Sequence, residues 1–105
     1  MPKYVVISNH APMSCPSANA KLRDVGRNLG KDVPRLLKTH GMKADAILHL
    51  DPGHKVLWVF DAPSAEAVRD FMYDGGFQRW NDFEFHMAST LDWINEKIEP
   101  QSTIW

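Results

Sequence analysis

The chain contains five histidines and one cysteine, the side chains best suited to bind a metal or exchange a proton near neutral pH. His10 and Cys15 follow the first β-branched segment, and His54 opens a later one. Imidazole nitrogen and thiolate sulfur bind Zn, Cu, Ni and Fe, and such ligands need not be adjacent in sequence. The sequence therefore predicts a transition-metal site with His10, Cys15 and His54 as ligands and one of these four metals as the cofactor.

Three further polar residues, His49, Glu84 and His86, are candidates for a fourth ligand or a supporting group. Glu84 and His86 occupy alternate positions, so in a strand they would share one face and could act as an acid/base pair. The simpler interpretation is that this pair faces solvent or a subunit interface.

Cys15 also has the position of a nucleophile. It directly precedes a predicted helix, whose unpaired N–H groups and positive dipole end favour the thiolate. With His10 to exchange protons, the two residues form a candidate catalytic pair. A second interpretation remains open, in which His10 and His54 are turn residues that bind backbone groups and Cys15 is a small buried residue.

Four segments have the β-branched or alternating composition of strands. A Pro-Gly turn separates the second from the third, which is typical of a hairpin. The predicted strands are Lys3–His10, Ala44–Leu50, Lys55–Phe60 and Phe83–Met87.

Three other segments place apolar residues three or four positions apart, the spacing of one helical face. The first helix is expected over about residues 17–40, with a kink or a restart capped by Asp32 because Pro34 interrupts it. The second helix is expected to end at Gly75, and a short C-terminal helix to begin at Thr90.

The element order βαββαβ predicts one α+β domain over residues 1–105, of the ferredoxin-like kind, with an antiparallel sheet in the order 4-1-3-2. This topology brings the ends of strands one and two and the starts of strands three and four to one edge. We therefore expect His10, Cys15 and His54 to meet there, and His40 to lie elsewhere.

The two long helices can cover only one face of that sheet. Val6, Leu57 and Val59 are expected on the other face, which would then be too apolar to remain in water. The natural cover is the sheet of a second copy, so the sequence predicts a homodimer with the architecture of a dimeric α/β barrel. The terminal Trp105 is likewise expected to dock on its own subunit or on the partner.

Composition limits the other partners. A net charge of −1 offers no electrostatic attraction for nucleic acid, and no apolar run approaches the roughly 20 residues of a membrane span. We expect a cytoplasmic protein that binds neither nucleic acid nor membrane.

Two motifs resemble a known group of proteins. The turn His10–Pro16 (HAPMSCP) and the segment His54–Ala67 (HKVLWVFDAPSAEA) are similar to small dimeric α/β-barrel proteins of unknown function, near the antibiotic-biosynthesis monooxygenase and muconolactone isomerase families. The resemblance implies that His10, Cys15 and His54 share a site. Met13 departs from the pattern, because related chains often have a glutamate after this proline.

The same resemblance implies an alternative function. The chain would be a cofactor-free enzyme of the monooxygenase or isomerase type, acting on a small apolar molecule in a pocket between sheet and helices. Its lining would include Trp58, Phe71, Phe83 and Phe85. A third possibility is a binding module whose interface is the function.

Overall fold

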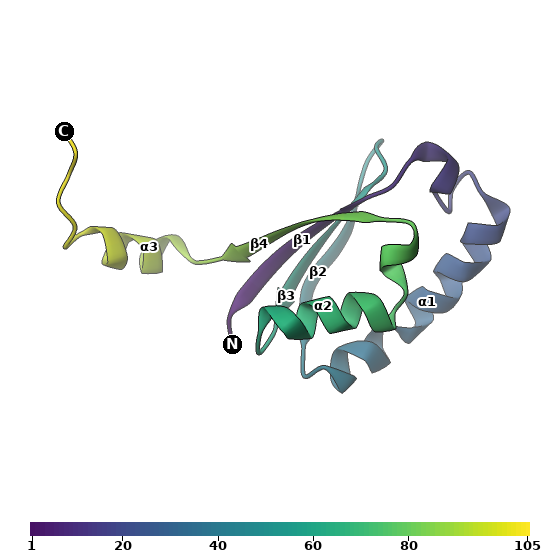
Figure 1. Cartoon of the computed structure of the whole chain (residues 1–105), viewed down its shortest axis with the longest axis horizontal. Coiled ribbons are helices and arrows are strands. Elements are labelled where there is room, and N and C mark those ends of the chain that lie inside the picture. The colour runs from purple at the N-terminus through teal and green to yellow at the C-terminus, as the bar shows by residue number, and fades with distance from the viewer.

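The computed structural model describes all residues, 1–105, as an α+β fold with four strands and three α-helices (Figure 1). Two short 3₁₀ turns complete it. In chain order the elements are β1 (Lys3–Asn9), η1 (Pro12–Ser14), α1 (Ala20–Thr39), β2 (Lys43–Leu50), β3 (Lys55–Asp61), α2 (Ala65–Asp74), η2 (Phe77–Arg79), β4 (Asp82–Ala88) and α3 (Leu91–Ile98).

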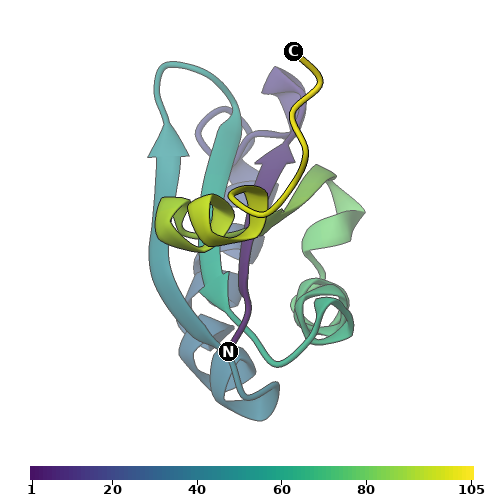
Figure 2. The same ribbon diagram turned by 90° about the vertical axis from the view of Figure 1, so that its left-hand side faces the viewer.

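The strands form one antiparallel sheet in the order β2-β3-β1-β4. Read from the other side this is the predicted order 4-1-3-2, consistent with a ferredoxin-like arrangement. Figure 2 shows β2 and β3, in blue and teal, beside the purple β1. The sheet of the single chain is open at β2 and β4 and does not close into a barrel.

Both long helices lie on the same face of the sheet (Figure 1). In β1, alternate residues Tyr4, Val6 and Ser8 are buried beneath them. The expectation that Val6 lies on the open face is wrong: its side chain is 2% exposed and pairs across from Trp58. Side chains alternate along a strand, so an error of one position in the assignment exchanges the two faces.

An aromatic and aliphatic core fills the space between helices and sheet. Ser8 is tolerated there because its hydroxyl accepts a hydrogen bond from the indole N–H of Trp58, at 3.0 Å. The core consists of Tyr4, Val6, Leu36, Met42, Trp58, Phe60, Ala62, Val68, Phe71, Met72 and Phe77.

Side-chain caps define where the helices begin. Asn19 accepts a hydrogen bond from the N–H of Leu22, so α1 begins at Ala20, later than predicted. Its predicted restart is absent, since Pro34 lies inside one helix and the Asp32 carboxylate binds Arg35 instead of capping. None of the helices combines the length and the apolar character needed to span a bilayer.

The C-terminal helix α3 lies apart from this core. It projects from the end of β4, away from the sheet and the other helices (Figure 1), and none of its residues is buried. The radius of gyration is 16.4 Å, whereas a compact domain of about 100 residues has a value near 13 Å. The predicted helix exists, but it does not pack on its own domain.

Candidate metal centre

His10, Cys15 and His54 come together at one edge of the sheet. Each offers one ligand atom, and these three atoms lie within 4.8 Å of one another. The backbone N–H of His10 donates to the carbonyl of His54 at 3.1 Å, which extends the pairing of β1 with β3 beyond the strands. This backbone contact also brings the two imidazole rings together, with their centroids 5.8 Å apart.

The turn after β1 carries Cys15 to the same place. Its N–H donates to the carbonyl of Pro12, the first residue of η1, and its own carbonyl accepts from the N–H groups of Ala18 and Asn19. Cys15 is therefore held on both sides by backbone hydrogen bonds and is only 3% exposed. A buried thiol between two imidazoles is a compact donor set of two nitrogens and one sulfur.

Asn81 orients the ring of His10. Its Nδ2 donates to the carbonyl of Phe77 at 2.9 Å, so its Oδ1 faces Nδ1 of His10, also at 2.9 Å. An amide oxygen only accepts, and Nδ1 of His10 must therefore carry the proton. The unprotonated Nε2 is left for a ligand, the arrangement by which metal-binding histidines are usually oriented.

Two imidazole nitrogens of this cluster have no hydrogen-bond partner although they are buried: Nε2 of His10 and Nδ1 of His54. Buried polar atoms are nearly always paired, because an unpaired one loses its hydration without compensation. A metal ion between these nitrogens and the sulfur would satisfy both.

The environment of Cys15 favours its thiolate. Burial raises the pKa of the thiol, but hydrogen bonds from the hydroxyl and N–H of Ser17, together with the adjacent imidazoles of His10 and His54, lower this pKa by more. The hydroxyl of Ser17 lies 2.8 Å from Sγ. The net result is a pKa of about 6, and thiolate is the form that binds metals and attacks electrophiles.

The other candidate ligands do not join this cluster. His49 is exposed and its Nδ1 contacts the carboxylate of Asp51 at 2.7 Å. Glu84 and His86 contact each other at 2.7 Å and are exposed on the open face of the sheet. Within one chain they form the expected pair and are exposed. This agrees with the simpler interpretation, in which the pair faces solvent or a subunit interface.

Sequence reasoning missed Asn81 and Ser17, which contact His10 and Cys15. Asn81 directly precedes β4, whose start lies at this same edge of the sheet. Its place in the topology could have identified it. Ser17 lies two residues after the cysteine, a spacing at which a hydroxyl commonly binds a neighbouring group.

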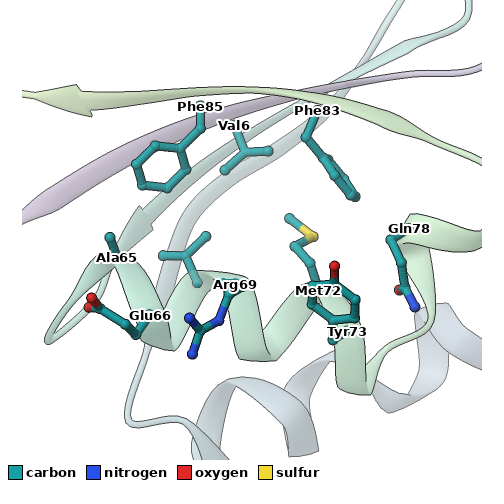
Figure 3. Close-up of a pocket in the computed structure, with 10 residues that line it drawn as sticks. Val6, Ala65, Glu66, Arg69, Met72, Tyr73, Gln78, Phe83 and Phe85 are labelled. Carbon is teal, nitrogen blue, oxygen red and sulfur yellow. The ribbon is translucent and has the colours of Figure 1, made fainter.

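A separate cavity of about 360 Å³ lies between α2 and β4. Phe83 and Phe85 point toward α2 from the sheet, and Met72 points toward them from the helix (Figure 3). The predicted lining is correct for these two phenylalanines and wrong for Trp58 and Phe71, which fill the core instead. Neither His10 nor His86 lines the cavity.

No protein-family model matches the chain, and no curated protein matches it. Among solved structures it is similar to a REP-associated tyrosine transposase bound to a REP hairpin, with a TM-score of 0.51 and 9% identity. The match covers 92% of this chain and 62% of that one. At this identity the likeness concerns the fold alone.

Fold and site together define a small α+β protein with a four-stranded antiparallel sheet. A His10/Cys15/His54 cluster at one sheet edge could hold a metal ion.

Proposed function

We propose that this chain is a transition-metal protein whose ligands are His10, Cys15 and His54. The observation that carries the proposal is the convergence of three buried or half-buried donors within 4.8 Å, two of whose nitrogens have no other partner. Thiolate and imidazole favour Zn, Cu, Ni or Fe over Mg or Ca, which prefer oxygen ligands.

Three protein ligands leave one position open for water or a small ligand, as in catalytic zinc sites. Met13 is the nearest thioether in sequence, but it is 85% exposed and so does not complete the set. A bound metal would hold Cys15 as the thiolate, and Asn81 would keep the His10 ring turned toward it.

The test is elemental analysis of protein purified without a histidine tag, followed by titration of the metal-free protein with each of the four metals. We expect one metal per chain for the wild type and none for His54→Ala. His49→Ala is the matched control, because it removes an exposed histidine of the same hairpin. Absence of uptake by the wild type, or equal uptake by His54→Ala, would contradict the proposal.

The proposed assembly is a homodimer in which the open faces of two sheets meet, in the manner of a dimeric α/β barrel. Support comes from the open face itself, where Val5 and Ile7 of β1 lie beside Val59 and Leu57 of β3 with no helix over them. A charge among these four residues, as in Val59→Lys, should convert the dimer to monomer. Sedimentation equilibrium measures this directly.

A second candidate function, a cofactor-free enzyme for a small apolar substrate, is favoured by the cavity between α2 and β4. Its volume lies within the range of ligand pockets, and Val6, Val68 and Met72 supply an apolar wall. The ionisable residues that line it are Glu66, Arg69 and Tyr73. Such an enzyme would therefore use one of these groups, so at least one of Glu66→Gln, Arg69→Ala and Tyr73→Phe would abolish turnover, while His54→Ala would leave it unchanged.

A further inference from the structure

Residues 89–105, which we name the C-terminal arm, expose an unusual amount of apolar surface. Helical spacing places Leu91, Ile94 and Ile98 on one side of α3, and all three are exposed. Ile104 and Trp105 follow in the tail and are almost completely exposed. A contiguous surface of this kind usually marks a contact with another molecule.

The arm also lacks the support that an isolated helix needs. α3 has eight residues, and helices of this length are marginal in water unless one face is packed. Its first turn lies near the N-terminus, where Trp93 borders a hollow with Met1, Pro2 and Lys3. Beyond that turn the arm runs away from the domain (Figure 1).

The same chain has a second uncovered apolar surface, the open face of the sheet. Its apolar part consists of Val5 and Ile7 in β1, Leu57 and Val59 in β3, and Leu48 in β2, and it is bordered by Glu84 and His86 of β4. Leu48 is exposed and the others are partly exposed. The helices α1 and α2 cover only the opposite face.

We infer that the C-terminal arm of each chain crosses to a second copy and packs its Leu91–Ile98 face at the outer edge of that copy's open sheet face, against Leu48 and Leu50 of β2, in a reciprocal exchange. The inference rests on the proposed homodimer and adds the segment that holds it together. Every chain carries one arm and one open face, so a twofold pair covers both surfaces at once.

The size of the open face supports an added contact. Four strands of about seven residues outline a flat area of roughly 450 Å². In a standard stable interface, each partner buries about 800 Å² of accessible surface. Two exchanged arms extend the contact beyond this outline with residues that are otherwise exposed.

The test uses the full-length chain in a mixture of isotope-labelled and unlabelled protein, in which nuclear Overhauser effects between chains are separated from those within a chain. We expect contacts between chains that join methyl groups of Leu91, Ile94 or Ile98 to those of Leu48 or Leu50. Arm contacts only within one chain would overturn the inference, as would an arm that is mobile in a dimer.

Two matched triple variants complete the experiment. Leu91→Ala/Ile94→Ala/Ile98→Ala removes the apolar face, and Asp92→Ala/Glu96→Ala/Glu99→Ala alters the same number of exposed residues outside that face, two in α3 and one at its C-cap. We expect the first to raise the dimer dissociation constant at least about 100-fold and the second less than about threefold, by sedimentation equilibrium.

The outcomes separate the two proposals. A dimer that survives the apolar triple variant but dissociates in Val59→Lys would overturn the arm exchange and leave the sheet-face dimer standing. A wild-type chain that is monomeric at micromolar concentration would overturn both.

Discussion

The two ends of the sheet differ in how their side chains are satisfied. At one end, His10, Cys15 and His54 are held by hydrogen bonds to Pro12, Asn81 and one another's backbone. At the other end, β4 passes directly into an arm whose apolar residues contact little of the chain. The contacts at the first end all lie within one chain, whereas the second end leaves its apolar residues exposed.

This difference separates two kinds of function. A site whose ligands converge through backbone contacts can bind its metal in a monomer, so its affinity should be independent of assembly. In the proposed exchange, the arm contributes only through its contact with a second copy. Changes at one end should therefore leave the property measured at the other end unaltered, and the predictions for Asn81 and Thr90 below test that independence.

Cys15→Ser should have the largest effect, since it removes the thiolate from the proposed ligand set. At free metal about 1,000 times its dissociation constant, binding stabilises a folded protein by about 4 kcal/mol. We expect this increase for the wild type and for the control Met13→Ala, and its loss in Cys15→Ser. Denaturant unfolding with and without metal measures it. Equal stabilisation of Cys15→Ser would show that the metal binds elsewhere.

Asn81→Ala should weaken metal binding about 10- to 100-fold, the usual cost of removing a hydrogen bond to a ligating histidine. Asn81→Asp keeps an oxygen opposite Nδ1 of His10 and should restore most of the affinity. The ¹⁵N chemical shifts of His10 report its tautomer, and we expect Asn81→Ala to change them. If Asn81 only supported the fold, these shifts would stay the same. The dissociation constant of the dimer should stay the same.

Alkylation of Cys15 in metal-free protein should follow its lowered pKa. Thiolate forms as the pH rises through about 6, so the rate should increase up to that pH and level off above it, where a free cysteine is still mostly thiol. Bound metal should block the reaction. Ser17→Ala removes a hydrogen bond to Sγ and should move the midpoint upward by roughly one pH unit. Replacement of His10 or His54 by alanine should also slow labelling near pH 6.

A buried structural thiol would behave differently. Labelling would then be slow at every pH until the protein unfolds, and substitutions at Ser17, His10 or His54 would leave its rate unchanged. That result would mean that the three residues share an edge of the sheet without forming a reactive site.

The sequence was sufficient for the sheet order and for the convergence of the three proposed ligands, because both follow from topology. Strand order determines which strand ends are neighbours, and His10 and His54 lie at such ends. Val6 was placed on the wrong face, since hydrophobicity alone does not distinguish two faces that are both apolar. Asn81 was missed because its role depends on an amide orientation that only the contact with Phe77 reveals.

The arm shows a different limit. The spacing of Leu91, Ile94 and Ile98 predicts an amphipathic helix, but it contains no information on which chain that face contacts. Local pattern determines the helix, whereas its position depends on surfaces far away in sequence. Trp105 is fully exposed, so it does not dock on its own subunit, and docking on a partner stays a prediction.

Thr90→Ala should have the smallest effect and should affect only the arm. The hydroxyl of Thr90 caps α3 by accepting a hydrogen bond from the N–H of Trp93 at 3.1 Å. Losing such a cap costs about 1 kcal/mol of helix stability, so the dimer should dissociate about fivefold more readily if the helical arm is what packs on the partner. Thr90→Ser keeps the cap and should match the wild type. Because the sheet edge with His10 and Cys15 lies at the opposite end, metal affinity should not change in either variant. Weaker metal binding in Thr90→Ala would show that the two ends are coupled, and an unchanged dimer would show that the helical form of the arm does not contribute to assembly.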